Sequence, residues 1–256
     1  MNKNAKQGFT LAEVLITLGI IGVVAAITLP TVINKAQNMI LKNQFKKAYS
    51  TFYNAMKLVQ VQNDAPVECY YWNENPYVAA KNDAICGERN EYGNCTRWIL
   101  RDGSPLPSDY NGKFADCQKF SEDLIKTMKV VKFCEKEALK NGCLTEAYRG
   151  ADKVKSEQHP DTEQDPNQVF SDTKIKNVYP AFMPSDGTLY IRFSRMSDYP
   201  LFAVDVNGHK GPNKWGYDIF TFSIIGNKQD GMTNLQSNYY VNEKGGKTFA
   251  EMLQSF

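Results

Sequence analysis

A long uncharged apolar run near the start of the chain constrains its fold more than any other feature. The 21 residues from Val14 to Asn34 contain no charged side chain. At about 1.5 Å of rise per residue, a helix of this length spans the roughly 30 Å hydrocarbon core of a bilayer. The sequence therefore predicts a membrane-spanning helix, with most of the 256-residue chain attached after it.

Glu13 lies directly before this run, and a charged residue is unusual in that position. A carboxylate carried to the bilayer centre costs about 2.5–3.5 kcal/mol, so such a residue normally has a partner or a function. Cleavage after Gly8 would make Phe9 the new amino terminus, whose ammonium group would lie one helical turn from Glu13. That cation would be able to neutralise Glu13 of the same chain or of a neighbouring helix.

The segment GFTLAEVLITLGIIGVVAAITLP resembles the prepilin-type cleavage and methylation segment of type IV pilins and type II secretion pseudopilins. The resemblance extends over about the first 60 residues. It implies that a prepilin peptidase cuts after Gly8 and methylates the amino group of Phe9. It also implies that Glu13 guides assembly by pairing with a neighbour's amino terminus. A bend at Pro30 is expected as well, because proline removes one helical hydrogen bond.

The same resemblance implies a structural subunit and not an enzyme. Such a pilin or pseudopilin enters the bacterial inner membrane with its large domain outside the cytoplasm, and then joins a periplasmic or cell-surface filament. The implied partners are prepilin peptidase, other pilin or pseudopilin subunits in a homo- or hetero-polymer, the inner-membrane assembly platform and membrane lipid. The amino terminus does not separate a type IV pilus from a type II secretion pseudopilus. The large, cysteine-containing head favours a minor or specialised subunit.

Two alternatives for the amino terminus stay open. Residues 2–26 could be an ordinary secretory signal, with a small-residue cleavage site that would leave Ile27 as the new amino terminus. The chain could otherwise be an exported binding module or enzyme of unrelated function, held by an uncleaved single-span anchor. Neither alternative explains Glu13, which would then lie in an apolar segment without a role.

Six cysteines within one stretch of the chain indicate its compartment. An even, clustered set favours disulfides in an oxidising environment. A zinc site is disfavoured because no two cysteines have the close spacing of metal ligands. Fifteen pairings are possible, among which the two local bridges, 86 with 95 and 134 with 143, are preferred. The cysteines are Cys69, Cys86, Cys95, Cys117, Cys134 and Cys143.

The lysines after the apolar run favour the opposite orientation. Lys35, Lys42, Lys46 and Lys47 follow the run, and the positive-inside rule would place this side in the cytoplasm. We give more weight to the cysteines and to the leader. The lysines are then interpreted as contacts with anionic headgroups or neighbouring subunits.

The periodicity of the chain predicts an α+β, pilin-like fold. A leader at 1–8 and a membrane helix at 9–32 continue as an amphipathic helix at 33–62, which packs on an antiparallel sheet of the head, residues 63–256. The cysteine-rich region covers 69–143 and contains an amphipathic helix near 113–131. A polar loop is expected at 155–168, three strands of a meander at about 186–226, and a docked helix over KTFAEMLQSF.

The loop DVNGHKGPNKWGYD is the most unusual motif outside the amino terminus. Its oxygen-bearing side chains lie on a glycine-rich backbone, which makes calcium a candidate ligand. The spacing fails as an EF-hand, because the fifth position is His209 and the twelfth is Gly216. The alternative is a long turn whose Asn and Asp side chains bond to their own backbone. The candidate ligands are Asp205, Asn207, Asn213 and Asp218.

Composition gives no clear signal for other functions. The formal net charge is +2, so no large basic excess indicates a nucleic acid partner. The two histidines, His159 and His209, stand in no recognisable nucleophile motif. The sequence therefore predicts no catalytic residues and no cofactor other than the candidate calcium.

Overall fold

The computed structural model describes residues 10–62, 69, 71–72, 84–91, 95–110, 114–115, 117–165, 168–193, 201–226, 233–237, 239 and 241–254. Gly8 and Phe9 lie outside these residues. The chain divides into two compact units, Met1–Lys42 and Asn43–Phe256, which are described one at a time below.

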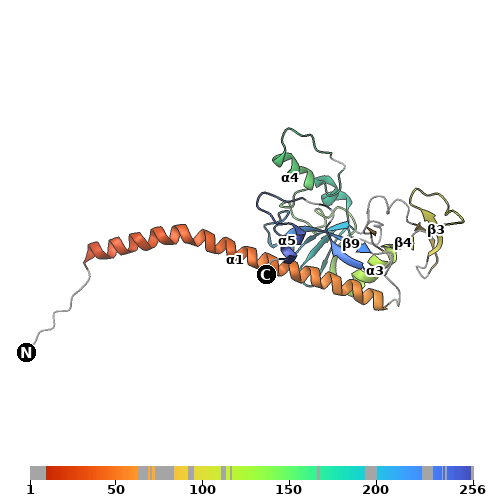
Figure 1. The fold of residues 1–256 in the computed structure, drawn as a ribbon, viewed down its shortest axis with the longest axis horizontal. Helices are drawn as coiled ribbons and strands as arrows, with labels where there is room; N and C mark the ends of the chain where they lie inside the picture. Colours follow the sequence, from red (N-terminus) through yellow and green to blue (C-terminus); the bar gives the residue numbers. More distant parts are fainter. Residues whose placement is uncertain are drawn as a thin grey trace, which may run out of the picture. The chain divides into compact units, whose positions relative to one another are not determined.

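Helix α1, Leu11–Gln62, is one continuous helix of 52 residues that includes Pro30 (Figure 1). Its first part is long and apolar enough to cross a membrane, and none of the residues in that apolar window is buried. This agrees with the predicted span, because an apolar surface of that length needs lipid or other helices around it.

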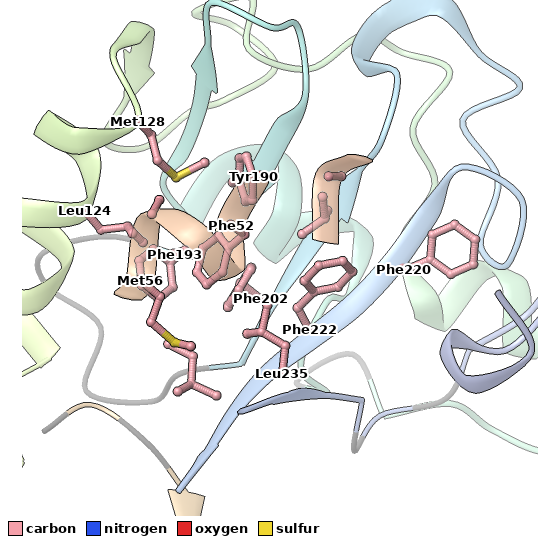
Figure 2. Close-up of a cluster of buried hydrophobic side chains, with 14 of the residues drawn as sticks. Phe52, Met56, Leu124, Met128, Tyr190, Phe193, Phe202, Phe220, Phe222 and Leu235 are labelled. Atoms are coloured by element: carbon pink, nitrogen blue, oxygen red, sulfur yellow. The ribbon is translucent and has the colours of Figure 1, made fainter. Parts of the chain in front are cut away.

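The part of α1 in the second unit is amphipathic, as predicted. Each of its buried side chains has another three or four residues away, the spacing that places them on one face of a helix. They join aromatic residues of the sheet and apolar residues of α3 in one core (Figure 2). The buried α1 residues of this core are Phe45, Ala48, Phe52, Ala55, Met56 and Val59.

The main sheet has seven strands in the order β1-β9-β8-β7-β6-β5, with β10 also paired to β9. The strands are β1 (Tyr71–Trp72), β5 (Val130–Cys134), β6 (Ala181–Pro184), β7 (Leu189–Ile191), β8 (Leu201–Asp205), β9 (Ile219–Gly226) and β10 (Thr233–Gln236). The pairs β7–β8 and β8–β9 are antiparallel, which confirms the predicted meander. Strands β5 and β6 extend the sheet to residues well before 186, and β1 pairs parallel to β9.

Both faces of the sheet are covered. Along β8, Phe202 and Val204 belong to the core under α1, whereas Leu201 and Ala203 belong to a second core. Side chains alternate between the two faces of a strand, so a strand buried on both sides becomes a continuous apolar run. The second core includes Trp215, Tyr148 and Phe170, which come from loops outside the helices and strands.

A small second sheet is formed by β2 (Ala84–Arg89), β3 (Cys95–Leu100) and β4 (Phe114–Ala115). The disulfide between Cys86 and Cys95 joins β2 to β3, and a second disulfide joins Cys134 to Cys143. Both local pairings preferred from the spacing are therefore present. Cys69 is also disulfide-bonded and is buried, while the side chain of Cys117 lies outside the description.

The predicted second helix is shorter than expected. Helix α3 covers Cys117–Thr127, and the chain then turns into β5. Lys129 has a φ of 52°, a left-handed conformation that ends a helix and reverses the chain. Val130 and Val131 therefore belong to a strand, and the prediction of helix up to residue 131 was wrong.

The remaining helices are short. Helix α4 (Ala151–Gln158) occupies the first residues of the predicted polar loop, so that prediction was wrong for 155–158. The short turns η1 (Lys174–Val178) and η2 (Gly208–Lys210) follow. Helix α5 (Phe249–Gln254) buries Phe249 and Met252, as expected for a docked terminal helix.

Candidate functional site

Glu13 caps the start of α1. One oxygen of its carboxylate, Oε2, accepts hydrogen bonds from the backbone N–H and the hydroxyl group of Thr10, both at 2.8 Å. The hydroxyl oxygen of Thr10 in turn accepts a hydrogen bond from the N–H of Glu13 at 3.3 Å. This reciprocal pair is a capping box, which satisfies amide groups that the first turn of a helix leaves without partners.

The same arrangement occurs at α5, where Thr248 and Glu251 exchange the equivalent bonds. The sequence pattern Thr-x-x-Glu at Thr10 and Thr248 would have predicted both caps. The function predicted for Glu13 depended on its charge alone. The structure adds a local function for this carboxylate that does not require a second chain.

The amino-terminal segment is similar to a known sequence motif. The family model described as the prokaryotic N-terminal methylation motif matches residues 3–29. No curated protein and no solved structure matches the chain significantly. The matched motif is the cleavage and methylation signal of prepilin-type proteins, a class that includes type IV pilins and pseudopilins. The chain therefore carries a prepilin-type signal, which overlaps the start of a helix of span length and precedes an α+β head.

The candidate calcium loop joins β8 to β9 and contains two buried carboxylates. Oδ1 of Asp205 accepts a hydrogen bond from the N–H of Asn207 at 3.0 Å. Oδ2 of Asp205 bonds to the hydroxyl group of Tyr148, which also lies 3.3 Å from the carbonyl oxygen of Gly208. The two oxygens of Asp218 accept bonds from the N–H groups of Asn213 and Lys214, each at 2.7 Å.

The side-chain amide of Asn213 lies between these groups. Turned so that its nitrogen donates, it reaches Oδ2 of Asp205 and the carbonyl oxygen of Gly208, both at 3.1 Å. Asn207 closes the turn by donating a hydrogen bond to the carbonyl oxygen of Gly211 at 2.9 Å. The sequence motif thus forms a buried hydrogen-bonded turn, in which Asn and Asp side chains bond to nearby backbone groups.

Burial governs the acid–base behaviour of this loop. The pKa of Asp205 is raised to about 8. Burial is the largest cause of this rise, and the nearby charge of Asp218 is the second. Burial also raises the pKa of Asp218 and, together with Asp205, the pKa of Tyr148. A buried carboxylate without a cation beside it favours its neutral form, because the low-dielectric interior penalises charge.

These residues do not fit a calcium ion as they lie. Calcium takes six to eight oxygen ligands, whereas all four carboxylate oxygens of Asp205 and Asp218 already accept hydrogen bonds from the protein. Within the described part of the chain, no group of three or more His, Cys, Asp or Glu side chains could hold a metal ion. Calcium binding stays a prediction from the sequence, and no step proposed below uses it.

Tyr148 contacts the loop from a distant part of the chain, and the sequence pattern did not identify it. It is 57 positions from Asp205 in the chain, and no local pattern connects the two. Two more hydrogen bonds join the loop to the segment around Tyr148. Nε1 of Trp215 donates to the carbonyl oxygen of Arg149 at 2.8 Å, and Nε2 of His209 bonds to the carbonyl oxygen of Cys143 at 2.8 Å. His209 therefore has a structural function in holding these two segments together.

Proposed function

We propose that this chain is a structural subunit, a pilin or pseudopilin, that is made as a precursor, cleaved after Gly8 and assembled into a filament through α1. The observation that carries the proposal is an apolar helix segment that overlaps a matched methylation motif and has no buried residue in its apolar window. In the precursor that surface faces lipid; in a filament the same surface faces the helices of neighbouring subunits. Such a function uses packing and requires no catalytic group.

The proposal includes a place and partners. A prepilin peptidase would process the leader in the bacterial inner membrane, and an assembly platform there would pass the subunit into a homo- or hetero-polymer. Disulfides in the head support a location outside the cytoplasm, since they persist in oxidising compartments. A type IV pilus and a type II secretion pseudopilus both fit these features, and the head with its additional small sheet favours a minor or specialised subunit.

The mature amino terminus tests the proposal directly. Mass spectrometry of the chain from cells with an active prepilin peptidase should find a polypeptide that begins at N-methylated Phe9. In cells without the peptidase the leader should remain, and both preparations should be membrane-bound. A chain that begins at Ile27 would indicate an ordinary signal peptide, and an uncleaved chain in both strains would indicate a plain anchor.

Substitutions at Glu13 separate its two possible functions. A Glu13→Ala change should leave membrane insertion intact and reduce filament formation at least tenfold, since it removes the charge and the cap. Glu13→Gln is the sharper variant, because glutamine also completes a capping box but carries no charge. If pairing with a neighbour's ammonium drives assembly, Glu13→Gln should fail nearly as severely as Glu13→Ala. Filament yield would be measured by shearing and immunoblotting.

The matched control lies in the same chain. Glu251→Ala removes an equivalent capping box from α5, at a cost to helix stability of about 0.5–2 kcal/mol by analogy with other caps. This variant should still form filaments. Assembly by Glu13→Gln at the level of the unchanged chain would reduce Glu13 to a helix cap and contradict the pairing.

A further inference from the structure

The two local disulfides of the head differ in exposure. Cys134 and Cys143 are 4% and 0% exposed, and both belong to the second core. Cys86 and Cys95 are only partly buried, and each is followed in the chain by an exposed residue. A thiolate must reach a sulfur atom to exchange with a disulfide, so solvent access governs which bridge reacts. The bridge between Cys86 and Cys95 is therefore the more accessible of the two.

The buried bridge is surrounded by further contacts. Nζ of Lys132 donates a hydrogen bond to the carbonyl oxygen of Gly142 at 2.8 Å, and Nε2 of His209 bonds to the carbonyl oxygen of Cys143 at 2.8 Å. These bonds hold the loop closed by this bridge against β5 and against the turn between β8 and β9. A reductant would therefore have to disturb the second core before it reached these sulfur atoms, and loss of close packing there costs free energy.

The accessible bridge joins two strands that contribute nothing to either core. Among the side chains that the structure describes, no residue of β2 or β3 belongs to the core under α1 or to the second core. The contacts of this hairpin include the pairing of β2 with β3, the disulfide, and an ion pair between Arg97 and Glu88. Both side chains of that ion pair are more than half exposed, and exposed pairs add little stability. The hairpin can thus open locally while the main sheet stays folded.

We propose that the bridge between Cys86 and Cys95 is a thiol–disulfide exchange site for a dithiol protein. One thiolate of the partner attacks a sulfur atom of the bridge, forms a mixed disulfide with it and releases the other cysteine as a thiolate. The second thiol of the partner then breaks the mixed disulfide. In the net reaction the dithiol gives two electrons and two protons to the bridge, so the partner leaves as a disulfide and both cysteines become thiols.

Exchange at this site has a local structural consequence. Reduction frees the β2–β3 hairpin from its cross-link and leaves the main sheet and the buried bridge intact. The inference concerns the head alone and goes beyond filament assembly, so it and the proposed function can fail independently.

Paired serine substitutions test whether the hairpin opens by itself. A Cys86→Ser, Cys95→Ser double variant should speed hydrogen exchange of the β2 and β3 amides by at least about tenfold and leave β8 and β9 unchanged. The matched control, Cys134→Ser with Cys143→Ser, should speed exchange in β5 and β6 of the main sheet. Unchanged exchange in β2 and β3, or faster exchange in β8 and β9, in the first variant would overturn the local opening.

A protein reductant tests whether the site accepts a macromolecular partner. Thioredoxin in which the second active-site cysteine is replaced by serine cannot complete the exchange, so it should stay joined to Cys86 or Cys95 as a mixed disulfide. Mass spectrometry of the adduct would identify the joined cysteine. The absence of an adduct, or an adduct at Cys134 or Cys143, would contradict the proposal.

Graded reduction of the unchanged chain is the decisive experiment, because it needs no substitution. The folded, detergent-solubilised chain would be treated with increasing dithiothreitol, its thiols would be alkylated, and mass spectrometry would locate the label. Cys86 and Cys95 should be labelled at a dithiothreitol concentration at least about tenfold lower than Cys134 and Cys143.

The unfolded chain provides the matched control for this experiment. Each bridge joins cysteines nine positions apart, so in urea the two pairs close loops of equal length and should be labelled together. Labelling of both pairs together in the folded chain, or of Cys134 and Cys143 first, would overturn the proposal. A tenfold difference that persists in urea would also overturn it, since the difference would then not come from burial.

Discussion

Raising the pH from about 5 to about 8 should lower the stability of the head against unfolding. A protein whose folded state favours charged carboxylates would show the opposite trend. Asp205 has a folded-state pKa of about 8, above the value of about 3.9 for an unfolded aspartate. Between these values the folded chain holds a proton that the unfolded chain has released. The free energy of unfolding should therefore fall with rising pH, by up to about 1.4 kcal/mol per pH unit.

The direction of this pH dependence follows from the protonation of Asp205 at low pH and at high pH. Below about pH 4 both states are protonated, so the stabilising contribution is fully present; above about pH 8 both are ionised and it is lost. The carboxyls of Asp102 and Glu251 have lowered pKa values because they accept hydrogen bonds from Ser104 and Thr248, and they lose their protons below this window. Asp218 is coupled to Asp205, so the titration belongs to the pair.

Denaturant unfolding of the detergent-solubilised chain at several pH values measures this effect. An Asp205→Asn variant has nearly the same shape without a titrating proton, and it should show a much flatter dependence between about pH 5 and pH 8. The hydrogen-bonding partners at Tyr148 and Asn207 remain available to the amide. A stability that rises with pH in the unchanged chain, or an undiminished slope in Asp205→Asn, would contradict the assignment.

Replacing Phe52 by alanine should lower the free energy of unfolding of the head by about 3–5 kcal/mol. The side chain is fully buried. Its ring lies 4.7 Å from that of Phe202 and 5.6 Å from those of Tyr190 and Phe193, measured between ring centres. The substitution removes these contacts and leaves a cavity between α1 and the sheet (Figure 2).

A Val61→Ala change on the same helix is the control for Phe52→Ala. Val61 is 74% exposed, so its truncation should change the stability by less than about 0.5 kcal/mol. Urea unfolding followed by tryptophan fluorescence would compare the two variants. A loss of less than about 1 kcal/mol for Phe52→Ala would show that the core does not depend on this ring.

Local patterns account for the parts of the fold that the sequence predicted. The apolar run, the amphipathic continuation of α1 and the alternating strands β7 to β9 each depend on residues within a few positions of one another. The two local disulfides have the same origin, since each joins cysteines nine positions apart. The end of α3 escaped prediction because a left-handed residue, Lys129, stops the helix inside an otherwise helical pattern.

The candidate sites also differ in how far local sequence patterns predict them. The sequence by itself determined the methylation motif, the span of α1 and the position of Glu13, because these features are contiguous in the chain and do not depend on how the head folds. Only the tertiary structure decided the character of the loop between β8 and β9. Folding brings Tyr148 to Asp205 and buries the carboxylates of Asp205 and Asp218 within hydrogen-bonding reach of backbone amides. An oxygen-rich motif has the same letters whether it is exposed or buried, and burial among internal donors favours a bound proton over a bound cation.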